Sequence, residues 1–115
     1  MIYLASPYTH EQAAVMERRF ELACAVVADL IRTGYIIYSP IAHFHPIAVR
    51  HELPRDFSFW QRQNLSMLSK ADTLFVLRLD GWETSKGVAN EIDCAAVMNI
   101  HTVHIFPEGY GVPSV

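Results

Sequence analysis

The chain has 115 residues, of which 51% are hydrophobic, and its formal net charge at pH 7 is −3. This length predicts a single domain over residues 1–115, and the apolar content is enough for a packed core, which excludes an intrinsically disordered chain. The nine lysine and arginine residues are scattered. That distribution argues against polymeric nucleic acid as a partner, because a phosphate backbone is held by clustered cations.

The remaining bulk features favour a cytoplasmic protein without a membrane partner. The chain opens directly into an apolar strand pattern rather than a signal peptide, and no apolar run approaches the roughly 20 residues of a membrane span. Cys24 and Cys94 fall in helical patterns rather than in a close metal-ligand pair. We therefore expect two buried, reduced thiols.

Strands and helices alternate along the chain. Residues 2–5 are an apolar run closed by Ser6-Pro7, which indicates a buried strand. A long helix follows, with Thr9 and Gln12 as the expected capping box at its start and Gly34 as the expected glycine at its end. Patterns of the same kinds predict strands over 35–39, 72–78 and 102–106 and helices over 57–70 and about 86–98.

The stretch 41–56 has no clear period. It contains three histidines together with Pro46 and Pro54. Because proline removes a backbone donor and interrupts helices, this stretch is predicted to be a loop with one helical turn at most.

This alternation predicts an α/β fold of the three-layer, doubly wound (flavodoxin-like) kind, with a parallel sheet of four to five strands. A strand order of 2-1-3-4 puts a switch point between the first and third strands, and ligands bind outside the carboxyl ends of the strands at such a point. Two loops then meet there, 6–8 and 80–85. Their expected substrate-binding residues are Ser6, Tyr8, Asp80 and Trp82.

Glu91 is the leading catalytic candidate in the helix that follows the second loop. It lies three residues after Val88 and four before Ala95, so it shares the apolar, core-facing stripe of that helix. An acidic side chain on such a stripe is uncommon unless it is paired or functional. Burial raises its pKa and the helix N-terminus lowers it, so the sequence leaves the direction of the shift open. The alternative is a boundary glutamate paired with an arginine or a backbone N–H.

Ser85, Lys86 and Gly87 open the same helix. A hydroxyl, free backbone N–H groups and a glycine that allows close approach can hold a phosphate or a sugar hydroxyl, although Ser85 is equally explained as a plain N-cap. Tyr3, near the mouth of the cleft, can reach a ligand or can be an ordinary strand aromatic. No dinucleotide fingerprint or P-loop is present, and no cofactor is expected.

His43 and His45 are alternate residues, which would project to one side of an extended chain and could bind a metal. No third ligand lies at a diagnostic spacing, so we expect no metal and favour a polar loop that lines the pocket. Trp60, on a helix face, is expected in the core, whereas Trp82 is equally suited to stack on a base or to cap the core.

Several segments together resemble the nucleoside 2-deoxyribosyltransferase-like superfamily, and more closely a small bacterial branch of it. The resemblance spans residues 2 to about 106, and the order and spacing of its segments are more specific than any one of them. The segments are Ile2-Tyr-Leu-Ala-Ser-Pro-Tyr8, Ser39-Pro-Ile-Ala-His-Phe-His-Pro46, Ala71-Asp-Thr-Leu-Phe-Val76, and Gly81-Trp82 followed by Ser85-Lys-Gly-Val-Ala-Asn-Glu91.

The resemblance implies roles for individual residues. The glutamate that matches Glu91 attacks the anomeric carbon of a deoxyribose and forms a covalent glycosyl-enzyme, which water or a second base then resolves. The tyrosine that matches Tyr3 positions that glutamate, and the serine that matches Ser85 binds the 5′ end of the sugar.

One position departs from the superfamily pattern. Where a member carries an aspartate that handles the leaving base, this chain has Asn64, eight residues before Asp72. An amide has no titratable proton to donate at neutral pH, although it can orient a base. The acid role then passes to His43, His45 or Asp80, or cleavage is slow or absent.

The expected function is therefore an enzyme that cleaves or transfers the N-glycosidic bond of a (deoxy)nucleoside or nucleoside 5′-monophosphate, with Glu91, Tyr3 and Asn64 at its centre. The alternative is a protein that binds a nucleotide-like ligand without turnover, and a third reading is an oligomerisation protein with a vestigial cleft. Superfamily sites are often completed by a neighbouring subunit. The tail with Tyr110 suits that purpose, so a homo-oligomer is expected.

Overall fold

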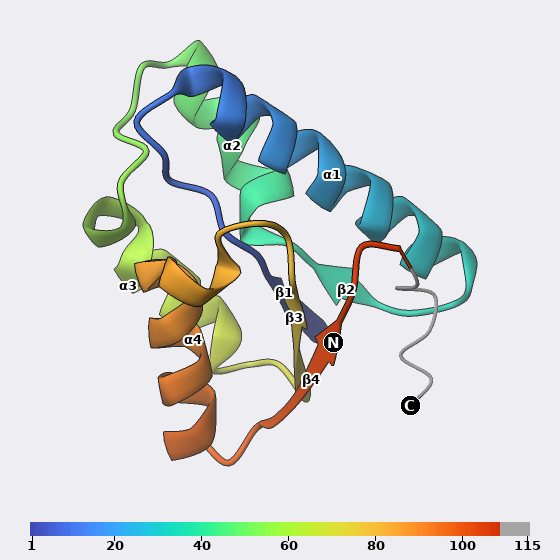
Figure 1. The fold of residues 1–115 in the computed structure, drawn as a ribbon. Helices are drawn as coiled ribbons and strands as arrows, with labels where there is room; N and C mark the ends of the chain where they lie inside the picture. The colour runs from blue at the N-terminus through green and yellow to red at the C-terminus, as the bar shows by residue number, and fades with distance from the viewer. Residues whose placement is uncertain (109–115) are drawn as a thin grey trace.

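The computed structural model describes residues 1–108, which fold into one parallel sheet covered by helices (Figure 1). The strands are Ile2–Ala5 (β1), Ile37–Tyr38 (β2), Thr73–Leu77 (β3) and His101–Ile105 (β4). The helices are Ala13–Arg32 (α1), Pro40–Arg50 (α2), Phe57–Leu68 (α3) and Lys86–Val97 (α4), with a short 3-10 helix at Trp82–Thr84 (η1).

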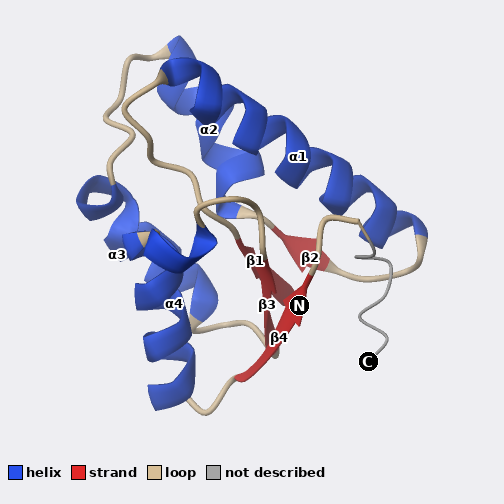
Figure 2. Cartoon of the chain, in the orientation of Figure 1, coloured by secondary structure: helices blue, strands red, loops and turns tan. Residues whose placement is uncertain are grey.

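The strand order is β2-β1-β3-β4, and every neighbouring pair is parallel (Figure 2). In the register, Leu4 pairs with Phe75 and Phe75 pairs with Val103. This confirms the predicted α/β class, the 2-1-3-4 order, and the switch point between β1 and β3. The strand predicted over 2–5 is confirmed, and the one predicted over 102–106 is displaced by one residue. The strands predicted over 72–78 and 35–39 were too long, most of all the latter, where only two residues pair.

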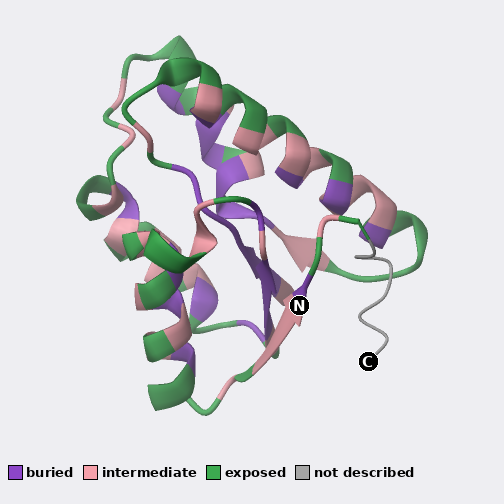
Figure 3. Cartoon of the chain, viewed as in Figure 1, coloured by how far each residue is buried: buried purple, intermediate pink, exposed green. Residues whose placement is uncertain are grey.

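Alternation along the strands divides the core between the two faces of the sheet. Tyr3 and Ala5 pack with α3 and α4, whereas Leu4, between them, packs with α1. Figures 1 and 3 show α1 on one side of the sheet and α3 and α4 on the other, with the sheet between them and its two central strands, β1 and β3, mostly buried. The fold is therefore the expected three-layer, flavodoxin-like arrangement.

The loop prediction for 41–56 was wrong, because most of this stretch belongs to α2. Ser39 caps the helix by accepting a hydrogen bond from the Ala42 N–H at 3.1 Å, and Pro40 occupies its first turn. Ile41, Phe44 and Ala48 are buried at helical spacing. Burial of that face offsets the backbone hydrogen bond that Pro46 removes inside the helix.

The predicted capping box of α1 is also wrong. Gln12 is the N-cap residue and makes no side-chain cap hydrogen bond, while the Thr9 hydroxyl donates to the Arg55 carbonyl at 2.8 Å. Thr9 therefore ties the loop after β1 to the segment before α3 instead of starting a helix. At the other end, Gly34 follows the last residues of α1 with φ +102°, as a C-terminal glycine does.

Cys24 and Cys94 are free thiols, but they are partly buried rather than fully buried as expected. Within residues 1–108, no helix has the length and apolar character needed to cross a membrane. The predicted role of the Tyr110 tail lies outside the described residues.

Candidate functional site

A cavity of about 430 Å³ opens at the carboxyl end of β1. Its volume lies in the range of small-molecule sites. Four segments form its walls: the loop after β1, the start of α2, the segment that leads into α3 together with α3 itself, and the start of α4. These are the elements that meet at the switch point between β1 and β3, as the topology predicts.

Glu91 lines this cavity from α4. It lies on the same stripe as Val88 and Ala95, as its spacing predicts, and only 7% of its surface is exposed. The hydroxyl of Tyr3, a fully buried residue of β1, donates a hydrogen bond to its carboxylate. The alternative of a glutamate paired with an arginine is not what the structure shows.

Burial raises the pKa of the Glu91 carboxyl to about 7, although the hydrogen bond from Tyr3 lowers it. This decides the direction that the sequence left open. Burial, followed by the charge of Glu91, raises the pKa of the Tyr3 hydroxyl, which therefore stays a proton donor at neutral pH. A carboxyl group whose pKa lies near 7, and which accepts a hydrogen bond from one fixed hydroxyl, is suited to act as a nucleophile or as a general acid or base.

The start of α4 lies on the rim of the same cavity. Ser85 is the N-cap residue, and its hydroxyl oxygen accepts from the Val88 N–H at 3.2 Å. Ser85, Lys86 and Gly87 all line the cavity, so the positive end of the helix and its free N–H groups point toward this rim. Both predicted roles of Ser85, N-cap and cavity residue, are compatible with its position.

An aromatic wall faces the cavity from α2 and α3. Phe44 and Trp60 stack with ring centroids 4.4 Å apart, and Tyr8 meets Phe44 edge to face at 5.1 Å. The Trp60 indole N–H donates to the Pro54 carbonyl at 2.7 Å, which fixes the ring. Trp60 is thus buried, as expected of a core residue, and also lines the cavity.

Two buried polar atoms of this cavity lack a hydrogen-bond partner among the described residues: the Ser6 hydroxyl oxygen and the Asn64 side-chain carbonyl oxygen. A buried polar group without a partner is costly and rare in folded proteins. Both residues were predicted from the sequence, and both can bind polar groups of a ligand in this cavity.

The structure brings together six of the predicted site residues as cavity lining and places Tyr3 directly behind Glu91. The lining residues are Ser6, Tyr8, Asn64, Ser85, Gly87 and Glu91.

Four other predicted residues do not line this cavity. His43 is exposed on α2, and His45 is buried behind Tyr8. Asp80 and Trp82 lie beyond the rim, where Trp82 packs against His104 and the Arg78 guanidinium.

The polar loop favoured for His43 and His45 is wrong, because both residues lie in α2. The common side that a metal pair would need is also missing, because residues two apart on a helix point about 200° apart. Within residues 1–108, no group of three or more His, Cys, Asp or Glu side chains is placed to hold a metal ion.

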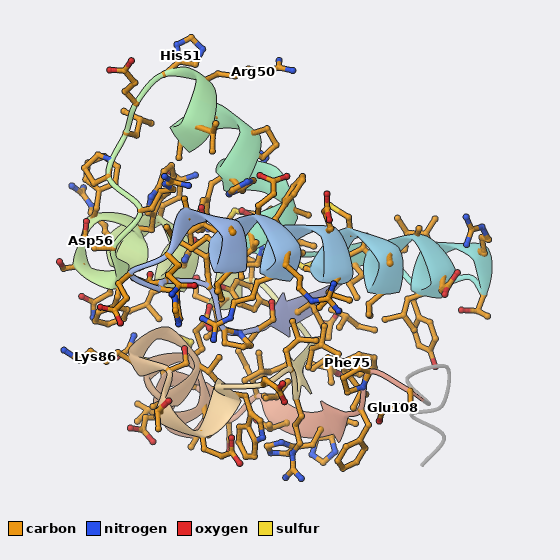
Figure 4. All side chains as sticks on the ribbon, turned by 45° about the horizontal axis from the view of Figure 1, so that its top comes forward. Arg50, His51, Asp56, Phe75, Lys86 and Glu108 are labelled. Carbon is orange, nitrogen blue, oxygen red and sulfur yellow. The ribbon has the colours of Figure 1, made fainter. Side chains whose placement is uncertain are left out.

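Sequence reasoning named Lys86 only as part of the helix start and missed the other charged residues of the cavity mouth. Arg55, Asp56 and Lys86 all line it, and Figure 4 shows Asp56 and Lys86 on the same side of the molecule. Asp56 caps α3 by accepting from the Phe59 N–H at 3.3 Å. An aspartate just before a predicted helix is an N-cap signal, which would have placed Arg55 and Asp56 at the mouth.

Arg19 of α1 was also missed, because nothing in the sequence marks it. Its guanidinium donates to the carbonyls of Tyr8 and Thr9, at 3.2 and 3.1 Å, and to that of Asp80 at 3.1 Å. Gly81 has φ +92°, and a Cβ there would lie 2.5 Å from the Arg19 Nη2 atom. Arg19 therefore fastens the loop after β1 to the loop after β3.

None of the curated proteins matches this chain. The family model of a domain of unknown function (DUF1937) matches residues 1–108. This range includes the whole sheet, its covering helices and every residue that lines the cavity. The chain therefore belongs to the DUF1937 family.

Proposed function

We propose that this protein cleaves or transfers the N-glycosidic bond of a (deoxy)nucleoside or nucleoside 5′-monophosphate, with Glu91 as the nucleophile. The observation that carries the proposal is the buried Glu91 carboxylate, which faces a cavity of nucleoside size and accepts a hydrogen bond from Tyr3. The sequence resemblance to deoxyribosyltransferases, in which the matching glutamate has this role, supports the same reading.

The chemistry is a double displacement. The ionised Glu91 carboxylate attacks the anomeric carbon, the bond from that carbon to the base nitrogen breaks, and a glycosyl ester of Glu91 forms. Water, or a second base, then attacks the same carbon and releases the carboxylate. Tyr3 donates to one carboxylate oxygen, so it orients the group and stabilises its ionised form against burial.

Features of the cavity support a nucleoside as the ligand. The aromatic wall of Phe44 and Trp60 offers a flat apolar surface for a base. Asn64 and Ser6 can hydrogen-bond its polar edge. At the rim, Ser85 and the N-terminus of α4 can hold a sugar hydroxyl or a 5′-phosphate.

A second candidate function is ligand binding without turnover. Asn64 favours it, because this residue lines the cavity in the position of the superfamily acid and cannot donate a titratable proton. In that case the same cavity binds a nucleotide-like molecule and releases no base.

The test is incubation with deoxynucleosides and their 5′-monophosphates, followed by measurement of free base. We expect release by the native protein and a loss of at least about 10³-fold in Glu91→Gln and Glu91→Ala. Glu83→Gln is the matched control, because Glu83 is exposed in η1 and does not line the cavity. Mass spectrometry of a quenched reaction should find a deoxyribosyl group on Glu91. Tight nucleotide binding with no base release from any of these proteins would contradict catalysis.

We also propose that the protein is a cytoplasmic homo-oligomer. Two thiols without a disulfide are typical of a reducing compartment. Large apolar side chains are exposed at Ile36 and Val97, which are 75% and 89% accessible. Light scattering during size-exclusion chromatography tests the oligomer, and a monomer at all concentrations would contradict it.

A further inference from the structure

Three side chains from three elements form a chain that runs from the cavity to solvent. The Tyr8 hydroxyl lies 2.5 Å from Nδ1 of His45, and Nε2 of His45 lies 2.8 Å from Oε1 of Glu17. Tyr8 lines the cavity, His45 is 2% exposed, and Glu17 is half exposed on the far side. His45 lies 37 residues after Tyr8 and 28 after Glu17 in sequence, so the fold alone brings it to the other two.

The hydrogen bond to Glu17 determines which tautomer His45 adopts. A carboxylate only accepts hydrogen bonds, so Nε2 carries a proton. When His45 is neutral, Nδ1 therefore accepts from the Tyr8 hydroxyl. When His45 is protonated, Nδ1 donates to the Tyr8 oxygen instead, and the hydroxyl proton of Tyr8 turns toward the cavity.

Packing holds this chain in place. The His45 ring stacks on Phe20 with centroids 4.5 Å apart, and it meets the Tyr8 ring edge to face at 5.5 Å. Two charged groups act on the Tyr8 hydroxyl: Arg55 lowers its pKa through a hydrogen bond and its charge, and Glu17 raises it through its charge. Burial raises the pKa of Tyr8 in spite of Arg55, so the hydroxyl stays protonated at neutral pH and can donate.

The proposed reaction needs such a donor, because the base leaves with an electron pair that must be protonated. Asn64 cannot supply a proton, and Asp80 and His43 do not line the cavity. Asp56 does line it, but the hydrogen bond from the Ser58 hydroxyl lowers the pKa of this exposed carboxyl and keeps it ionised.

We propose that Tyr8 is the general acid for the leaving base and that His45, held by Glu17, restores the proton that Tyr8 gives up. As the glycosidic bond breaks, the Tyr8 O–H proton passes to the base nitrogen, and the Nδ1–H proton of His45 passes to the Tyr8 oxygen. His45 becomes neutral and keeps its Nε2–H on Glu17. In the second step, the proton of the attacking water returns through Tyr8 to Nδ1. Tyr8 is the catalytic residue here, and His45 and Glu17 are positioning residues.

This inference rests on the proposed function. Two substrates with different leaving groups test the nucleophile Glu91 and the general acid Tyr8 separately. Adenine needs protonation as it leaves deoxyadenosine, whereas para-nitrophenolate leaves a para-nitrophenyl deoxyriboside without it. Both substrates are assayed with and without a 5′-phosphate on the same preparation of each variant. The ratio of the two rates is then independent of the folded fraction, so a partly unfolded variant still gives a decisive result.

We expect Tyr8→Phe to lower adenine release by about 10²- to 10⁴-fold and to change nitrophenol release by less than about threefold. His45→Asn and Glu17→Gln should shift the ratio in the same direction, by smaller factors. Glu91→Gln should abolish both reactions. Tyr35→Phe and His51→Asn are the matched controls: Tyr35 is exposed after α1 and His51 at the end of α2, and neither lines the cavity. Neither control should shift the ratio.

Equal loss on both substrates in Tyr8→Phe, or no loss on either, would overturn the relay. So would a native protein that releases nitrophenol but no adenine, a result that leaves Glu91 as the nucleophile. Release of neither product by the native protein would instead remove the proposed function, and the relay with it.

Discussion

On the face of the sheet under α1, the buried cluster is wholly apolar, with Leu4, Phe75 and Leu77 at its centre. On the opposite face, under α3 and α4, the same strands and the helix α4 bury Tyr3 and Glu91 among apolar neighbours. The first face contributes stability through burial alone. The second keeps a carboxyl group where its charged form is disfavoured, which is expected at a functional site rather than in a structural core.

The largest effect on stability should come from the apolar face. Leu4→Ala removes a fully buried side chain between β1 and α1 and should lower the free energy of unfolding by about 2–5 kcal/mol, because a cavity remains. Urea unfolding at pH 7 measures this. Val97→Ala, at an exposed position, should change it by less than about 0.5 kcal/mol.

Neutralising Glu91 is expected to raise the free energy of unfolding rather than to lower it. Its folded-state pKa of about 7 lies above the ordinary value of 4.5, so the folded protein binds more protons than the unfolded chain between these values. The contribution of Glu91 to stability therefore falls as pH rises from about 4.5 to 7 and then levels off. Glu91→Gln should be more stable than the native protein by up to about 3 kcal/mol at pH 8 and nearly equal to it at pH 4.

Urea unfolding of both proteins across this pH range tests the difference, with Glu83→Gln as the exposed control. A gap between Glu91→Gln and the native protein that does not grow with pH would mean that Glu91 titrates in the folded state as it does in the unfolded chain. The contrast between the two faces would then be lost.

The pH profile of nitrophenol release from the para-nitrophenyl deoxyriboside, whose leaving group needs no acid, tests the same contrast through activity. In the proposed mechanism only the ionised carboxylate attacks, so kcat/KM for this substrate should fall about tenfold per pH unit below 7 and reach a plateau above it. Tyr3→Phe removes the hydrogen bond that lowers this pKa, and the midpoint should move upward by about one pH unit or more. An unchanged midpoint in Tyr3→Phe would contradict the role given to this hydroxyl.

The smallest effect concerns α2, which contributes Ile41 and Phe44 to the cavity. Ser39→Ala removes the N-cap hydrogen bond to Ala42 and should cost about 1 kcal/mol of stability in urea unfolding. Gln12→Ala, at an N-cap without a side-chain hydrogen bond, should cost less. A larger cost for Gln12→Ala would contradict the reassignment of both helix starts.

Much of the fold was predictable because its signals are local. Strands β1 and β3 and helices α3 and α4 follow from apolar periodicity, and the parallel order follows from their alternation. The errors come from competition between local signals. In the prediction, Pro46 was given more weight than the helical spacing of Ile41, Phe44 and Ala48, although these residues do form a helix. Thr9 was predicted to cap α1, but its hydroxyl donates to the distant Arg55 carbonyl.

In the candidate site, too, some residues are marked by a signal in the sequence and others are not. Glu91 was found because an acid on an apolar stripe is visible in the sequence, and Asn64 was found by resemblance. The link from Tyr8 through His45 to Glu17 had no sequence signal, because its members lie on a loop and two helices that become neighbours only on folding.

The sequence by itself therefore determined the class of fold, the parallel pairing of its strands and the burial of Glu91, since each depends on patterns within one or two elements or on their alternation. Only the tertiary structure decided that Tyr3 is bonded to Glu91, that burial outweighs this bond and raises the pKa of the carboxyl, and that His45 lies behind Tyr8. These depend on distances between elements and on exclusion of water, which periodicity does not encode.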